Sequence, residues 1–174
     1  SFLPAGIFRG LDFPNAWCTE FLDFNEPANQ FQPRTPGALN SSCPSTVTIV
    51  NYCTAGTTTN GCLPAMSSTG VPSLSATSGF VVTANGIEGQ KQGLIFYSIT
   101  GRAALAWGAS SSFLCIKSPT QRTSTQNTNG TVAQCDGSIS IDFSAFLSAN
   151  PGALGGPTSI SPLAAGNLAN FQCW

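Results

Sequence analysis

The chain has 174 residues, of which only 7% are charged and none is histidine, and its formal net charge is −1. A typical soluble domain carries about 25% charged residues, so this chain lacks the basic surface that binds nucleic acid, and we expect no nucleic acid partner. Without histidine the common Ser-His-Asp and Cys-His catalytic sets have no base, so we expect that the protein is not an enzyme.

Residues 1–44 are rich in proline and in apolar side chains. The prolines block regular helices and sheet ladders, which predicts an extended arm. The apolar side chains must pack against a surface, because a solvated tail would not carry so many of them. They include Phe2, Leu3, Ile7, Phe8, Leu11 and Phe13. We therefore expect an N-terminal arm over 1–44 and a β domain over 45–174.

The β domain is predicted from short apolar or alternating segments separated by turn residues. In chain order, we expect strands over 47–52, 74–77, 79–84, 93–99, 113–117, 138–143 and 167–174. The run 93–99 is the longest apolar stretch and predicts a buried central strand. Asp142 is also suited to cap one or two helical turns over 143–149. The sum predicts an all-β fold, an antiparallel sandwich or jelly roll stapled by disulfides.

The seven cysteines indicate an oxidising compartment. They are widely spaced among polar residues and have no zinc-ligand or Cys-X-X-Cys spacing, which is typical of disulfides. Cys53–Cys62 and Cys115–Cys135 would each close a polar loop and are the expected local disulfides. Cys18–Cys43 would hold the proline-rich arm, which leaves Cys173 unpaired. The chain starts at Ser1 without methionine and has no apolar run of about 18 residues, so we expect a mature secreted protein with no membrane span.

Several motifs extend from residue 52 to the end of the sequence. They are Tyr-Cys-Thr-Ala-Gly at 52–56, Asn-Gly-Cys at 60–62, Gly-Ile-Glu-Gly-Gln-Lys-Gln-Gly-Leu-Ile-Phe-Tyr at 86–97, Gly-Arg at 101–102, Trp-Gly at 107–108, Phe-Leu-Cys-Ile-Lys at 113–117, Cys-Asp-Gly at 135–137 and Phe-Gln-Cys-Trp at 171–174. This pattern resembles an uncharacterised secreted domain of planctomycete-type bacteria. The resemblance implies an extracellular or surface location and no established catalytic activity.

Acidic residues are the first candidates for a catalytic or metal site. A glycoside hydrolase needs two carboxylates across a cleft, and the candidate pairs are Asp23 with Glu26, and Glu88 with Asp136 or Asp142. Seven acidic residues give such pairs by chance, so we interpret them as turn and cap residues and expect no catalytic site. Asp12 and the segment 23–26 offer oxygen ligands without EF-hand spacing, so a structural calcium ion is the alternative to no cofactor.

Two features of the sequence relate to glycans. Asn40 and Asn129 begin Asn-X-Ser/Thr motifs in predicted loops, which are acceptors for N-glycosylation. A carbohydrate-binding module is the alternative function, with Trp107, Trp174 or Tyr97 as the aromatic platform on which a sugar stacks. A glycoside hydrolase is a third hypothesis.

The leading hypothesis is a non-enzymatic structural protein of the cell surface or extracellular matrix. A net charge near zero favours association between copies, so we expect a homo-oligomer or polymer such as a filament or layer. The apolar arm is suited to lie along the open sheet edge of a neighbouring copy.

Overall fold

The structure, a computed structural model, describes residues 49–106 and 112–174. These residues form short strands and one helix: β1 (Ala65–Thr69), β2 (Val81–Ile87), β3 (Gln92–Gly93), β4 (Ile95–Ser98), β5 (Arg102–Ala106), β6 (Phe113–Ile116), β7 (Gln121–Arg122), β8 (Gln126–Asn127), β9 (Gly137–Asp142), α1 (Phe143–Ala149) and β10 (Asn170–Cys173). Two sheets have the strand orders β1-β2-β9 and β10-β4-β7, and two smaller sheets are β3-β8 and β5-β6. All pairings between these strands are antiparallel, which confirms the predicted antiparallel β class.

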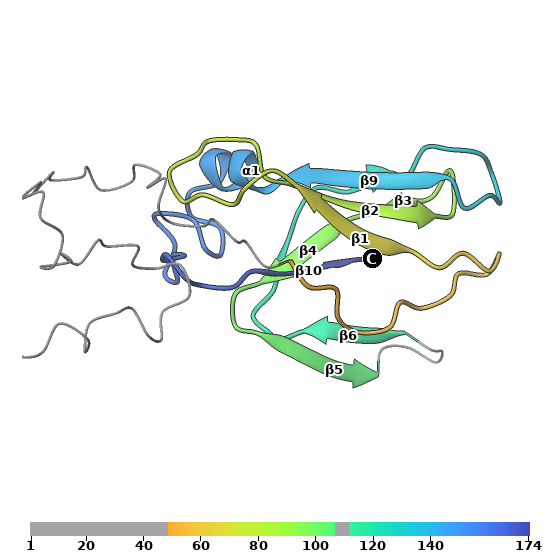
Figure 1. The fold of residues 1–174 in the computed structure, drawn as a ribbon, viewed down its shortest axis with the longest axis horizontal. Coiled ribbons are helices and arrows are strands. Elements are labelled where there is room, and N and C mark those ends of the chain that lie inside the picture. The colour runs from red at the N-terminus through yellow and green to blue at the C-terminus, as the bar shows by residue number, and fades with distance from the viewer. Residues whose placement is uncertain (1–48, 107–111) are drawn as a thin grey trace, which may run out of the picture. The chain divides into compact units, whose positions relative to one another are not determined.

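β4 is the central strand, as the apolar run 93–99 predicts. All four of its residues are buried, and it is hydrogen-bonded to β10 on one side and to β7 on the other. In Figure 1, β4 and β10 lie between the layer of β1, β2, β9 and α1 and the pair β5-β6. Because successive side chains of a strand point to opposite faces, β4 supplies side chains to two apolar clusters.

The larger cluster collects side chains from both three-stranded sheets and from the helix. Its buried members are Phe80, Val82, Ala84, Ile95, Tyr97, Ile139 and Phe143. Tyr97 lies at its centre: its ring meets the ring of Phe143 edge-on at a centroid distance of 4.8 Å, and its hydroxyl donates a hydrogen bond of 2.6 Å to the carbonyl oxygen of Leu154. The polar end of this buried side chain is thereby satisfied.

The smaller cluster lies on the opposite face of β4. Leu94, Phe96 and Ile116 are its buried members, with Tyr52 and Leu114 packed against them. β6, together with Tyr52, therefore covers the second face of the central strand. With both faces of β4 covered, three of its four residues are large apolar or aromatic side chains, and the fourth, Ser98, is buried and hydrogen-bonded to Thr100.

The helix follows the β9 strand as the sequence predicts. The side chain of Asp142 accepts a hydrogen bond of 2.9 Å from the backbone N–H of Ala145, which is the N-cap interaction. Its second carboxylate oxygen accepts a hydrogen bond of 2.7 Å from the backbone N–H of Gly79, so this side chain also fixes the chain that leads into β2. The helix then ends at Asn150.

Two predicted strands are wrong within the described residues. Residues 49–52 and 74–77 belong to no strand. In the segment 74–77, the hydroxyl oxygen of Ser73 accepts hydrogen bonds from the backbone N–H groups of Ser75 and Ala76, both at 3.3 Å. This local turn competes with strand pairing. Conversely, β1 and β5 were not predicted, because one is mostly polar and the other mostly alanine.

The disulfides differ from the predicted local pairs. The structure joins Cys53 to Cys115 and Cys62 to Cys135, so the predicted pairs Cys53–Cys62 and Cys115–Cys135 are wrong. The bridges connect positions 62 and 73 residues apart in the sequence. They therefore tie together different parts of the fold, whereas the predicted bridges would each have closed one loop.

Sheet order brings Cys62 to Cys135. β1 and β9 flank β2 on opposite sides, and Ala65 and Ser138 lie opposite the same β2 residue, Asn85. Each cysteine precedes its strand residue by three positions, so both arrive at the same end of the sheet. The turn that was expected inside a Cys53–Cys62 loop does form, with the N–H of Gly61 donating to the carbonyl oxygen of Thr58 at 3.0 Å.

The chain enters the described region beside β5 and β6. The Cys53–Cys115 bridge links it to β6, and the guanidinium carbon of Arg102 in β5 lies 4.2 Å from the centroid of the Tyr52 ring. The predicted arm, its boundary at 44/45, and Cys18 and Cys43 lie outside the described residues. No helix in the described ranges has the length and apolar character needed to cross a membrane.

Candidate functional site

The carboxylate of Glu88 is engaged in the structure of a turn. This side chain is buried, with 6% of the residue exposed, and its Oε1 atom lies 3.0 Å from Nζ of Lys91. The hydrogen bond from Lys91 is the main cause that lowers the pKa of Glu88, with smaller contributions from Asn60 and Thr58. A carboxylate held in its charged form by these partners stabilises the turn before β3 and is poorly suited to act as a general acid.

The other two described carboxylates serve as backbone caps. Asp136 accepts a hydrogen bond of 2.8 Å from the backbone N–H of Thr131, which lowers its pKa. Asp142 caps α1, and the N–H groups of Ala145 and Gly79 lower its pKa. Over residues 49–106 and 112–174, no group of three or more His, Cys, Asp or Glu side chains could hold a metal ion. The calcium candidates Asp12 and 23–26 lie outside these ranges.

Three aromatic residues were candidates for a sugar-stacking platform, and the prediction for Tyr97 is wrong. Its side chain is fully buried in the larger cluster, so no ligand can stack on it. Trp107 lies outside the described residues. Trp174 is 65% exposed and is the predicted platform residue that the structure places at the surface.

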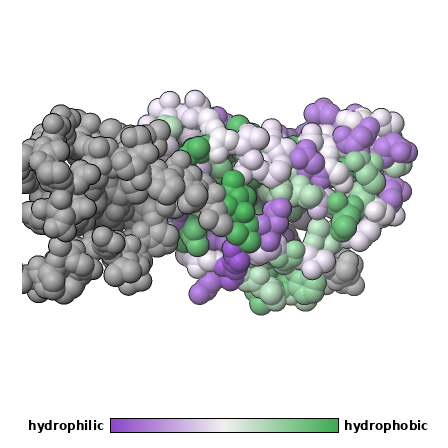
Figure 2. Space-filling view, viewed as in Figure 1, coloured by the Kyte–Doolittle hydropathy of each residue, from purple (hydrophilic) through white to green (hydrophobic). Residues whose placement is uncertain are grey.

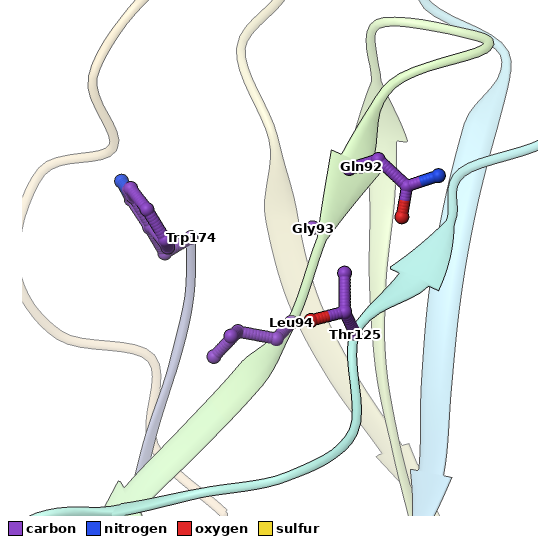
Figure 3. A pocket seen from close by; sticks show the side chains of 5 residues that line it. All are labelled: Gln92, Gly93, Leu94, Thr125 and Trp174. Atoms are coloured by element: carbon purple, nitrogen blue, oxygen red, sulfur yellow. The ribbon is translucent and has the colours of Figure 1, made fainter.

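Trp174 borders a pocket at the end of β10. The pocket has a volume of about 370 Å³ and is lined by Gln92, Gly93, Leu94, Thr125 and Trp174. Figure 3 shows the side chain of Leu94 pointing toward Trp174, whereas the amide of Gln92 points away on the other side of the strand. The guanidinium carbon of Arg122 lies 6.0 Å from the Trp174 ring centroid. The pocket thus has one aromatic and one aliphatic wall.

The backbone fixes the position of Trp174. Its N–H donates to the carbonyl oxygen of Leu94 at 2.9 Å, and the N–H of Leu94 donates to the carbonyl oxygen of Trp174 at 2.7 Å. Gln92 and Thr125 were not predicted as lining residues. They come from β3 and from the segment before β8, and only the pairing of these short strands brings them to the end of β10, so no local sequence signal marks them.

Asn129 and Cys173 differ in accessibility. Asn129 is exposed in a loop and has a left-handed backbone with φ of 54°, so its side chain is accessible to a modifying enzyme. Asn40 lies outside the described residues.

Cys173 is a free thiol among the described cysteines, as predicted, and packs against the larger cluster. Burial raises its pKa to about 11, which leaves little thiolate for exchange reactions at neutral pH.

An apolar surface gathers on the β5-β6 pair. Ala104, Leu105, Ala106 and Phe113 are exposed there, Leu105 to 61% and Phe113 to 39%. Figure 2 shows apolar (green) surface along the lower border of the described part, where Figure 1 places β5 and β6. We call these four residues the β5 surface. Among the described residues, β5 pairs with β6 alone, so its other edge carries no partner strand.

Comparison with protein-family models, with curated proteins and with solved structures finds no match for this chain.

Proposed function

We propose that this protein is a non-enzymatic structural subunit of a cell surface or extracellular matrix, which assembles with copies of itself through its N-terminal arm. The observation that carries the proposal is the combination of open strand edges among the described residues with a sequence over 1–44 that is rich in proline and in apolar side chains. An extended peptide adds to an open sheet edge through backbone hydrogen bonds, and its side chains add apolar contacts.

The charge and the disulfides support this role. With 7% charged residues and a net charge of −1, copies of the domain repel each other weakly. The two long-range disulfides suit a secreted protein that must persist outside the cell. Glycans on Asn129 would add to such a surface. In this proposal the two three-stranded sheets, which share one apolar cluster, are the layers of a sandwich.

Deletion of residues 1–15 tests the assembly. The deletion removes the apolar side chains from Phe2 to Phe13 and leaves all residues of the described domain in place. We expect the full chain to form particles larger than one copy in light scattering and the deleted chain to remain a single copy. A single-copy full chain, or an unchanged particle size after deletion, would contradict the proposal. Far-ultraviolet circular dichroism checks that the deleted chain folds.

A carbohydrate-binding module is the second candidate. The exposed ring of Trp174 at the pocket, with Arg122 beside it, favours this function, because an aromatic face and a nearby hydrogen-bond donor suit a sugar ring. Retention of the protein on immobilised polysaccharides should then be lost in Trp174→Ala. Phe113→Ala removes an exposed aromatic ring outside the pocket and serves as the control. Equal retention of both variants would exclude the pocket as a sugar site.

A further inference from the structure

β5 is an edge strand without lysine or proline, and its only irregularity is a register shift against β6 between Arg102 and Leu105, which leaves Leu105 and Ala106 in regular pairing. Natural edge strands are commonly shielded by lysine, proline or inward-pointing charge. Four of the five β5 residues are Ala-Ala-Leu-Ala, and the fifth, Arg102, places its guanidinium over the ring of Tyr52. Leu105 is 61% exposed although it lies directly opposite Leu114, a member of the smaller cluster. The strand thus offers an apolar side-chain row next to open backbone groups.

The β1 edge is less suited to an apolar partner. Among the described residues, β1 also pairs on one side only, with β2. Its exposed residues are Ala65, Ser67 and Thr69, so a partner strand would gain little apolar burial there. A segment carrying phenylalanine and leucine should therefore prefer β5.

The chain enters the described domain next to β5. Tyr52 contacts Arg102 in β5, and Cys53 is bonded to Cys115 in β6, so the chain passes these two strands at residues 52 and 53. From residue 49 back to residue 13 there are 36 positions, which span roughly 120 Å when extended. The prolines of this stretch favour an extended chain over one that folds back. The apolar end of the arm is therefore expected to reach a neighbouring copy.

We infer that the β5 surface is the acceptor for residues 2–13 of a neighbouring copy, which add as a strand to the open edge of β5. This inference rests on the proposed self-assembly and assigns the site at which it takes place. Pairing would cover Leu105 and Phe113 with apolar side chains of the arm and would satisfy the open backbone groups of β5. Each copy both donates an arm and accepts one, so the contact is head-to-tail and repeats along a filament or layer.

Leu105→Lys tests the acceptor site in the full chain. A lysine at the open edge places a charge where the arm would bury apolar side chains, and it is tolerated in the single copy because the position is exposed. We expect the protein concentration needed for assembly, measured by light scattering, to rise about tenfold or more. Leu74→Lys is the matched control: Leu74 is 60% exposed, lies outside every strand, and should leave assembly unchanged.

The variants separate the two proposals. If the 1–15 deletion abolishes assembly and Leu105→Lys does not, the arm-mediated assembly holds and β5 is the wrong acceptor. If Leu105→Lys abolishes assembly and the deletion does not, β5 pairs directly with β5 of a second copy, and the arm is overturned as the occupant. If neither changes the particle size, both proposals fail. Equal loss in Leu105→Lys and Leu74→Lys would show a general effect of charge and would overturn the β5 site.

A photo-cross-linking experiment identifies the partner directly. A benzophenone side chain at position 8 is introduced into the full chain, which is mixed with an isotope-labelled copy before irradiation. We expect mass spectrometry to find cross-links from position 8 to the peptide containing 102–106 of the other isotopic form. Cross-links confined to one isotopic form would show that the arm docks on its own domain, and cross-links to β1 would show another edge. Either result overturns the inference.

Discussion

Tyr97 shows how one side chain can stabilise the core and also fix a loop. Its ring packs among the aromatic rings of the larger cluster, and its hydroxyl donates to the carbonyl oxygen of Leu154. Tyr52 is the opposite case, because its buried hydroxyl has no hydrogen-bond partner among the described residues. The same chemical change, removal of one hydroxyl, should therefore have different consequences at the two sites.

Tyr97→Phe should lower the free energy of unfolding by about 1–2 kcal/mol, since it leaves the half-buried carbonyl of Leu154 without its donor. Tyr52→Phe should leave the stability unchanged or raise it slightly. Urea unfolding of the two variants, followed by circular dichroism, measures the difference. A larger loss for Tyr52→Phe than for Tyr97→Phe would contradict the hydrogen-bond assignment.

Asp142 couples stability to pH. The N–H groups of Ala145 and Gly79 favour its charged form and hold its pKa below the ordinary value of 3.8. A lowered pKa in the folded state gives stability that is complete above the unfolded-state pKa and is lost as the pH falls through the folded-state pKa. Asp142→Asn should therefore melt at a lower temperature than the natural chain at pH 7, and the gap should close below about pH 4.

Thermal melts of the natural chain and Asp142→Asn at pH 7, 5, 3 and 2 measure this effect. Asn keeps the size of the side chain and can still accept a hydrogen bond, so the comparison isolates the charge. A gap between the two melting temperatures that stays constant down to pH 2 would show that the carboxylate charge does not contribute.

At the scale of the element, β4 is the strand that the sequence predicts best, whereas β1, β5 and the two-residue strands β7 and β8 are missed. An apolar run with both faces buried is visible in the sequence because every residue carries the signal. Three of the five residues of β1 are serine or threonine, and β5 consists mainly of alanine, so neither has an alternating pattern. These two strands exist because β2 and β6 offer them a paired edge, and that edge is a tertiary property.

The disulfide partners are also determined by how the strands pair. Cys62→Ser combined with Cys135→Ser should lower the free energy of unfolding by about 4 kcal/mol on the chain-entropy model, because the bridge closes a loop that spans 73 positions. Cys173→Ala, which removes a thiol outside any bridge, should cost much less. Chemical unfolding under oxidising conditions measures the stabilities. Peptide mapping without reductant should recover Cys62 linked to Cys135, and recovery of Cys53 linked to Cys62 would contradict the structure.

For the whole molecule, the shared strand β4 makes the two apolar clusters interdependent. Leu94 belongs to the smaller cluster and Ile95 to the larger one, yet they are neighbours in the sequence. Loss of either cluster exposes one face of the same strand, so both clusters should melt together.

Leu94→Ala and Ile95→Ala should each lower the free energy of unfolding by about 2–5 kcal/mol, the usual cost of a truncated core residue. Each variant should retain a single transition, at which the heat absorption and the near-ultraviolet circular dichroism change together. Two separated transitions in Leu94→Ala would show that the β5-β6 side of the molecule unfolds on its own.

The sequence by itself determined the class of the chain, the central strand and the strand that leads into a capped helix. These features follow from local composition and from the alternation of apolar residues, which are present in the sequence whatever the fold. Only the tertiary structure decided the disulfide partners, the burial of Tyr97, the pocket at Trp174 and the open edge of β5. Each of these depends on which distant segments become neighbours, and a sheet pairs its strands by geometry that no single segment encodes.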